Sequence, residues 1–160
     1  MLTVPSGIAI RDGVLPDDIE LCAAIWVRAV ESRDGVVDAE AMTQRVRASF
    51  ENPILRFAVA TSPRMGFTMV ESGRADPTEA LLHYLAVEPG GVGRGVGGAL
   101  LSDAVEYTKR DGFRSLVLEV RTNNARAIDL YWRAGFVPFG DEIPHPLAGY
   151  PMRSYRLSLE

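Results

Sequence analysis

The stretch from residue 81 to residue 120 constrains the fold of this chain more strongly than any other part of the sequence. An apolar run, Leu81–Val87, predicts a strand, and a second apolar run, Ser115–Val120, predicts another. Between them, the segment from Gly95 to about Asp111 places its apolar residues at helical spacing and predicts a helix. A strand, a helix and a strand in this order form a right-handed crossover, which makes the two strands parallel neighbours in one sheet.

Short apolar runs separated by turns predict further strands on both sides of this crossover, and short connections favour antiparallel neighbours. The predicted strands are Ile8–Arg11, Leu55–Thr61, Gly66–Glu71, Leu81–Val87, Ser115–Val120, Phe136–Asp141 and Tyr150–Leu159. The predicted helices are a segment that starts at Leu15–Pro16 and has an apolar face from Ile19 to Ala29, then Asp38–Phe50, Gly95–Asp111 and Asn124–Ala134. The order β-α-α-β-β-β-α-β-α-β-β predicts an α/β fold of the α+β type: a mixed, mostly antiparallel central sheet of about seven strands with helices on both faces.

Composition excludes several classes of protein. The 160 residues are 47% hydrophobic and 24% charged, which is ordinary globular composition and predicts one domain, residues 1–160. Seventeen basic against twenty-one acidic side chains give a net charge of −4, which argues against a nucleic-acid partner. The single Cys22 excludes an internal disulfide and a two-cysteine zinc site. We find no run of about 18 apolar residues and no basic leader, so we expect a cytoplasmic protein with no membrane partner.

The segment Glu88–Gly98 is rich in glycine, since seven of its eleven residues are Gly or Pro. Glycine lets a ligand approach the backbone, and the free N–H groups of the following helix attract anions, so the segment predicts a phosphate-binding loop. It contains no lysine, which excludes a P-loop. Gly93–Gly98 also matches the G-x-G-x-x-G fingerprint of dinucleotide-binding proteins, with Glu119 about 20 residues further on. Only 62 residues follow Gly98, too few for the rest of a doubly wound sheet, so a dinucleotide-dependent oxidoreductase is the weaker alternative.

Two motifs resemble those of the GNAT superfamily of N-acetyltransferases, whose element order is also the predicted one. The first corresponds to the family's acetyl-CoA signature, Val-x-Pro followed by Gln/Arg-x-x-Gly-x-Gly/Ala. Here it is Val87-Glu88-Pro89 and Val92-Gly93-Arg94-Gly95-Val96-Gly97. The second, Asn-x-x-Ala-x-x-Leu-Tyr and then Gly-Phe, is Asn124-Ala125-Arg126-Ala127-Ile128-Asp129-Leu130-Tyr131 and Gly135-Phe136. Val92 departs from the family's Gln or Arg, which removes a polar side chain that would reach the pyrophosphate.

The resemblance implies an acetyl-CoA site built mainly from backbone groups. Backbone amides of the glycine-rich loop are expected to bind the pyrophosphate, and an amide of the preceding strand is expected to polarise the thioester carbonyl. The expected cofactor-binding residues are Leu85, Val87, Val92, Gly93, Arg94, Gly95, Gly97, Gly98 and Asn124. Asn124 is expected to contact the pantetheine amides or to cap its helix, and both roles are compatible. No metal is expected.

Acetyl transfer to an amine needs a base for the ammonium proton and an acid for the departing thiolate. The family's Leu-Tyr tyrosine is that acid, so Tyr131 is expected to protonate the thiolate, with a packed core tyrosine as the structural alternative. The segment around Glu119 is similar to ribosomal-protein alanine acetyltransferases, where a glutamate in this place is the base. A half-buried carboxylate suits that role, and a surface carboxylate is the alternative. His83, inside a predicted strand, is the rival base, or else a packed histidine.

We therefore expect an acetyl-CoA-dependent N-acetyltransferase that transfers the acetyl group directly to a primary amine. The expected acceptor is a small amine or amino acid, or a protein N-terminus. A non-catalytic acyl-CoA-binding sensor is the alternative from another class of function. The sequence leaves the acceptor and the oligomeric state open, a homodimer included.

Overall fold

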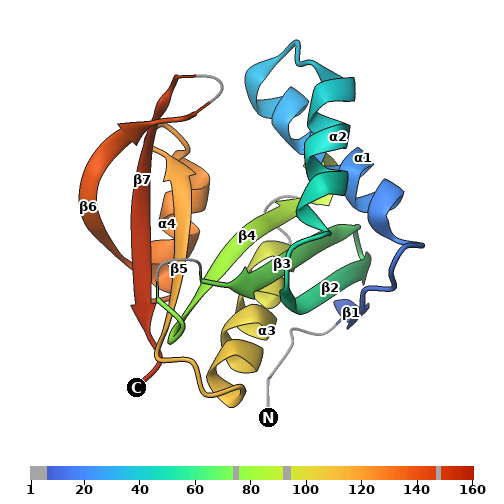
Figure 1. The fold of residues 1–160 in the computed structure, drawn as a ribbon. Helices are drawn as coiled ribbons and strands as arrows, with labels where there is room; N and C mark the ends of the chain where they lie inside the picture. Colours follow the sequence, from blue (N-terminus) through green and yellow to red (C-terminus); the bar gives the residue numbers. More distant parts are fainter. Residues whose placement is uncertain (1–6, 74–75, 92–94, 147–148) are drawn as a thin grey trace.

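The computed structural model describes residues 7–73, 76–91, 95–146 and 149–160. Within these residues, seven strands form one sheet of order β1-β2-β3-β4-β5-β7-β6 (Figure 1). The strands are β1 (Ala9–Asp12), β2 (Ile54–Ser62), β3 (Gly66–Ser72), β4 (Glu79–Val87), β5 (Ser115–Arg121), β6 (Val137–Pro144) and β7 (Pro151–Ser158). The helices are α1 (Ile19–Asp34), α2 (Ala39–Ser49), the short 3-10 helix η1 (Pro89–Gly91), α3 (Val96–Arg110) and α4 (Ala125–Arg133).

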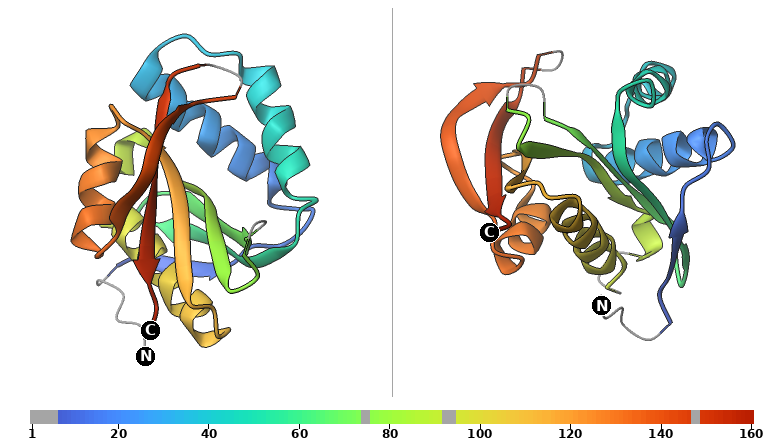
Figure 2. Two further views of the ribbon diagram at one scale, coloured as in Figure 1. Left: turned by 60° about the vertical axis from the view of Figure 1, so that its left-hand side comes forward. Right: turned by 60° about the horizontal axis from the view of Figure 1, so that its bottom comes forward.

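Helices cover both faces of the sheet (Figure 2). On one face, Cys22 and Ile25 of α1 and Val46 of α2 pack against Phe67 and Met69 of β3. All five side chains are at most 1% exposed, so this layer is a dense apolar core. We call this side of the sheet the α1–α2 face.

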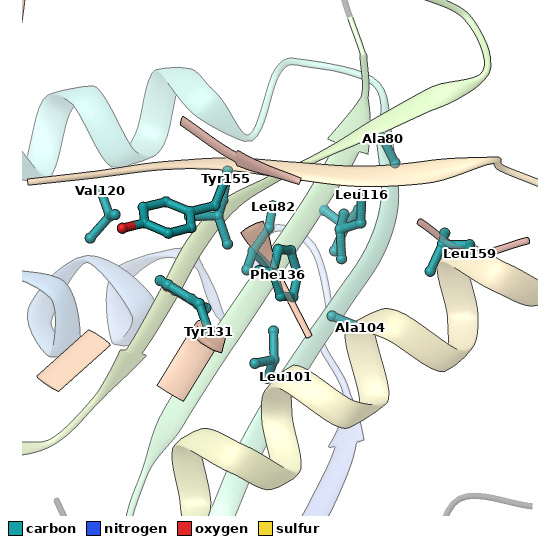
Figure 3. Packing of buried hydrophobic residues seen from close by; sticks show 12 residues of the cluster. Ala80, Leu82, Leu101, Ala104, Leu116, Val120, Tyr131, Phe136, Tyr155 and Leu159 are labelled. Carbon is teal, nitrogen blue, oxygen red and sulfur yellow. The ribbon is translucent and has the colours of Figure 1, made fainter. Parts of the chain in front are cut away.

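On the opposite face, α3 and α4 pack against the middle of the sheet. Leu101 of α3 and Tyr131 of α4 meet Leu82 of β4, Leu116 of β5 and Phe136 in a second buried cluster (Figure 3). We call this side the α3–α4 face. Because each helix pair buries its own apolar cluster, the sheet is sandwiched between two cores.

The predicted fold class and element order are confirmed, with bounds that differ by a few residues. The predicted helix start at Leu15–Pro16 is wrong, because residues 15–18 form a turn and α1 begins at Ile19 after its N-cap Asp18. α1 also continues to Asp34, beyond its predicted apolar face, and β6 continues from Asp141 to Pro144. β6 is longer than predicted because its pairing with β7 resumes after an irregularity, at Ile143 and Pro144. No helix among the described residues has the length and apolar character needed to cross a membrane.

One pair of strands is parallel, and this pair comes apart. β4 and β5 pair only at their first residues, where Glu79, Ala80 and Leu81 lie beside Ser115, Leu116 and Val117. Beyond Leu81 and Val117 the strands separate (Figure 1). β4 continues beside β3, whereas β5 continues beside β7. The sheet therefore has a split at its centre, with β4 and β5 as its two walls.

A β-bulge in β4 lies at this split. Met69 of β3 is opposite Tyr84 and the next residue, Val70, is opposite Leu82, so His83 is an extra residue in β4. The bulge exchanges the faces of the strand. Before it, Leu82 packs on the α3–α4 face, and after it, Tyr84 packs on the α1–α2 face.

Candidate functional site

The first turn of α3 ends the glycine-rich segment and lies beside Val87, at the C-terminal end of β4. This is the end at which β4 has separated from β5, and we call it the open end of the split. Its N-cap, Gly95, has a φ of 83°, a left-handed conformation that favours glycine. The N–H groups of Val96, Gly97 and Gly98 have no partner within the helix, because a helix cannot pair its first N–H groups. The helix dipole adds positive potential at the same place. This terminus is suited to bind a diphosphate.

The packing of the protein itself does not require glycine at positions 97 and 98. A Cβ at Gly97 would lie 3.7 Å from Leu130 and 3.8 Å from Val87, and one at Gly98 would lie 4.0 Å from Leu130. These are ordinary contact distances, although each glycine in a helix costs about 1 kcal/mol relative to alanine. The open space therefore fits a ligand that approaches the backbone closely. Three other expected residues, 92–94 (Val92, Gly93 and Arg94), lie outside the described residues.

The backbone of β4 offers hydrogen-bond donors to the split. The N–H of Glu88 donates to the carbonyl oxygen of Met65 at 2.9 Å, on the side of β3. Since N–H groups alternate in direction along a strand, the N–H groups of Val87 and Leu85 point the other way, to the edge that β5 has left. Both residues were expected to contact the cofactor, and this orientation suits a ligand that lies along β4.

Tyr131 of α4 lies at the split on the α3–α4 face. It is 7% exposed and belongs to the cluster that contains Leu82 of β4 and Val120 of β5, one residue from each wall. Its ring is 5.7 Å from that of Phe136, at an angle of 59°. Burial raises the pKa of the Tyr131 phenol to about 12, so it is protonated at neutral pH. Tyr131 is packed in the core, as the structural alternative expected, and its role as the acid stays a prediction.

Asn124 has the structural role that the sequence allowed for it. It is the N-cap of α4, and its Oδ1 accepts a hydrogen bond from the N–H of Ala127 at 3.3 Å. This bond fixes the start of the helix that carries Tyr131. A contact between Asn124 and pantetheine stays a prediction.

His83 lies at the bulge on the β4 wall. Its ring stacks on that of Tyr84, with centroids 4.4 Å apart and planes within 5° of parallel. The Nδ1 of His83 is 3.1 Å from Oε2 of Glu71. The His83 side chain is 27% exposed, whereas the Glu71 side chain is 2% exposed. The histidine is held by packing and by a polar contact, yet part of it reaches solvent.

Glu71 was not among the site residues expected from the sequence. It is the penultimate residue of β3, and its Oε2 also accepts a hydrogen bond from Nδ2 of Asn52 at 3.1 Å. A buried carboxylate is costly without such partners. An acid next to the apolar run 66–70 was the available signal, but its partners come from two other segments of the chain.

Glu119 on the β5 wall is exposed, so of the two possibilities that the sequence left open, it is the surface carboxylate. The reason is the split, because β4 has left β5 before this point and nothing from β4 covers the carboxylate. On the same face of β5, Arg121 contacts Asp34 of α1 at 2.5 Å, which places this side of β5 on the α1–α2 face. His83 and Glu119 thus share that face, on opposite walls of the split.

Two residues between β6 and β7, His145 and Tyr150, lie beside Arg121 of the β5 wall. The guanidinium of Arg121 lies 3.7 Å from the ring centre of Tyr150, and the rings of Tyr150 and His145 stack at 4.6 Å. Burial and the charges of Arg45 and Arg121 lower the pKa of His145, against the opposing effect of Glu119. In the described part of the chain, no three His, Cys, Asp or Glu side chains are grouped so as to hold a metal ion.

The arrangement of the sheet argues against the dinucleotide alternative. Six neighbouring strand pairs make up the sheet in the described residues, and only β4 and β5 are parallel. A doubly wound dinucleotide-binding sheet is mostly parallel. The roles of the glycine-rich helix terminus and of the buried tyrosine in an acetyl-CoA site stay predictions.

Comparison with known families gives a match to the acetyltransferase (GNAT) family over residues 31–136. Among individual proteins, an uncharacterized protein of Mycobacterium leprae is 32% identical over 126 residues, which is 78% of this chain and 33% of that protein. The ribosomal protein bS18-alanine N-acetyltransferase of Escherichia coli is 43% identical over 58 residues, or 36% of this chain and 39% of that enzyme. The sequence matches thus span about one third of the first relative and 39% of the second.

Solved structures resemble the whole described fold. A protein of the GNAT family from Desulfovibrio desulfuricans has a TM-score of 0.74 and 26% identity, with 96% of this chain and 99% of that chain covered. The ribosomal-protein-S18-alanine N-acetyltransferase of Escherichia coli has a TM-score of 0.72, 24% identity and coverages of 96% and 94%. At this identity the second likeness shows the fold alone.

Proposed function

Since the chain belongs to the GNAT family of acetyltransferases, we propose that it transfers the acetyl group of acetyl-CoA directly to a primary amine. The observation that carries the proposal is the split between β4 and β5. The glycine-rich terminus of α3 lies at its open end, and Tyr131 packs against residues of both walls.

Backbone groups bind and orient the co-substrate in this proposal. The N–H groups of Gly97 and Gly98 bind the diphosphate, and the donors at Leu85 and Val87 hold the pantetheine arm and polarise the thioester carbonyl. Asn124 supports this arrangement by fixing the start of α4. The thioester supplies the activated acetyl group, and holding both substrates in one site supplies the proximity that the reaction needs.

Side chains of the two walls and of α4 move the protons. An ammonium is no nucleophile, so a base must first remove a proton from it. His83 on β4 and Glu119 on β5 are the two proposed bases, and both lie on the α1–α2 face. The amine nitrogen then forms a bond to the carbonyl carbon, the carbon–sulfur bond breaks, and Tyr131 donates its proton to the thiolate. The second proton that the nitrogen loses passes through solvent and restores the Tyr131 phenol. The raised pKa of Tyr131 keeps that proton available.

The acceptor is proposed to be a small amine or amino acid, or a protein N-terminus, and to reach the split from the α1–α2 face. The family match and the ribosomal-protein alanine N-acetyltransferase among the relatives support an amine acceptor of this kind. A cytoplasmic location and a single domain over residues 1–160 stay predictions.

The test is an assay for free thiol released from acetyl-CoA in the presence of a panel of amines, amino acids and short peptides. We expect release with at least one acceptor, and a loss of kcat of about 10²-fold or more in Tyr131→Phe. Tyr155→Phe is the matched control, because Tyr155 is buried in the same cluster. Tight acetyl-CoA binding with no release for any acceptor would favour the sensor function instead.

A further inference from the structure

The contact between Glu71 and His83 is unusual for its burial. Glu71 is 1% exposed, on the α1–α2 face of β3, and a carboxylate in such a place is stable only with hydrogen-bond donors around it. Asn52 supplies one donor from the turn after α2, and His83 meets the same oxygen, Oε2, from β4. Three segments that are distant in the sequence therefore converge on one carboxylate oxygen.

The bulge is what places His83 and Tyr84 on the same side of β4. Without the extra residue, positions 82, 83 and 84 would alternate between the two faces, and His83 would not lie on the same side as Tyr84. The stacking of the two rings shows that they share a side. On its other edge the Tyr84 hydroxyl lies 3.1 Å from Oγ of Ser49 in α2, which anchors the stack.

The position of the carboxylate decides which nitrogen of His83 is basic. A carboxylate accepts hydrogen bonds only, so a neutral His83 facing Glu71 carries its proton on Nδ1. The lone pair is then on Nε2, the nitrogen that can take a proton from an acceptor amine. Since the side chain is 27% exposed, the ring is accessible to such a group.

We propose that Glu71 is a positioning residue that makes His83 the base of the transfer reaction. This inference rests on the proposed function. The ammonium of the acceptor gives a proton to Nε2 of His83, and the negative charge of Glu71 stabilises the imidazolium that forms. The freed amine forms its bond to the carbonyl carbon, the carbon–sulfur bond breaks, and the thiolate takes the proton of Tyr131. The second proton that the nitrogen loses on becoming an amide passes through solvent and restores the Tyr131 phenol. His83 releases its own proton to solvent before the next cycle.

The first test reads the tautomer of His83 directly and needs no substrate. The chain has two histidines, His83 and His145, so a long-range ¹⁵N–¹H correlation spectrum contains two imidazole patterns, which His145→Gln assigns. We expect His83 with its proton on Nδ1 in the unmodified protein and a mixture of tautomers in Glu71→Gln. A proton on Nε2 in the unmodified protein would overturn the proposal, even if the variant failed to fold.

Asp103→Asn is the matched control for this spectrum. Asp103 is also a buried carboxylate, 6% exposed, but it is paired with Arg56 at 2.8 Å on the α3–α4 side. Its replacement is expected to lower the melting temperature without moving the nitrogen signals of His83. If both variants moved those signals alike, the effect of Glu71 would be a general loss of structure.

The second test is a double-mutant cycle on kcat, with any acceptor found active in the thiol assay. We expect Glu71→Gln to lower kcat about tenfold with little change in KM for acetyl-CoA, and to lower it no further in a His83→Gln background. Equal losses in both backgrounds, or an unchanged kcat in the single variant, would refute the positioning role. Absence of any thiol release by the unmodified protein would instead refute the proposed function.

Discussion

The two walls of the split carry the same kinds of side chain in opposite surroundings. On the β4 wall, His83 is held in place by Tyr84 and faces the buried carboxylate of Glu71 on the neighbouring strand β3. On the β5 wall, Glu119 is exposed, and the neighbouring Arg121 is tied to Asp34 of α1. The surroundings of a polar residue in a strand thus depend on whether the next strand is still beside it. β3 runs beside β4 at His83, whereas β4 has separated from β5 before Glu119.

The largest expected effect on kcat comes from removing the proposed base of each wall in turn. We expect His83→Gln to lower kcat about 10²-fold, because it removes the positioned proton acceptor. Glu119→Gln is expected to lower kcat less than about tenfold, since an exposed carboxylate is replaced by solvent as a proton carrier. Steady-state thiol release by both variants checks this ranking, and the reverse order would move the base to β5.

The loss of unfolding free energy is also expected to be larger for the buried Glu71 than for the exposed Glu119. Glu71→Ala leaves Asn52 and His83 without their buried acceptor, which is expected to cost about 1–3 kcal/mol of unfolding free energy. Glu119→Ala is expected to stay within about 0.5 kcal/mol, as is usual for surface substitutions. Urea titrations of the two variants measure the difference. Equal midpoints would show that burial does not distinguish these carboxylates.

Gly97→Ala tests the proposed diphosphate site at the start of α3, where backbone N–H groups, and not side chains, are the binding groups. The new Cβ fits the protein and improves helix propensity, so stability is expected to rise by up to about 1 kcal/mol. The same methyl group obstructs the diphosphate, so the Kd for acetyl-CoA is expected to rise about tenfold, or about 1.4 kcal/mol. Calorimetry of unfolding and of binding tests both signs. If stability and affinity for acetyl-CoA rose together or fell together, the result would count against the diphosphate site.

The smallest expected effect is the contribution of His145, which lies between β6 and β7, to the pH dependence of stability. The pKa of His145 is lowered by burial and by Arg45 and Arg121, so the folded protein takes up this proton less readily than the unfolded chain. Stability from this source is therefore complete above the ordinary value of about 6.5 and declines as the pH falls through and below it. His145→Gln should remove this part of the decline. Melting temperatures at a series of pH values, with Glu119→Gln as a second variant, measure it.

Much of the fold could be predicted from the sequence because its signals are local. The glycine-rich segment after Leu81–Val87 and the change from strand to helix period fixed the crossover, and the confirmed elements differ from prediction by a few residues. Tyr131 and Asn124 were also identified through a local motif, and the structure places both on α4 or at its start.

The side-chain part of the site could not be predicted in the same way, because it depends on contacts between distant segments. Asn52, Glu71 and His83 meet only after β3 and β4 have paired around a bulge. The exposure of Glu119 depends on where β4 and β5 stop pairing, which neither strand reveals alone. A binding site made of backbone groups can be proposed from composition and motif. A cluster of polar side chains can be located only when the pairing register of the strands is known.

The extra residue in β4 is not needed by either core. If position 83 were deleted, Leu82 and Tyr84 would become neighbours opposite Val70 and Met69, and regular alternation would keep both on their present faces. Tyr84 and Ala86 would stay in the cluster under α1, and Leu85 would stay in the one against α3. The strand thus carries its histidine at a point where one residue can be added without disturbing the packing on either side.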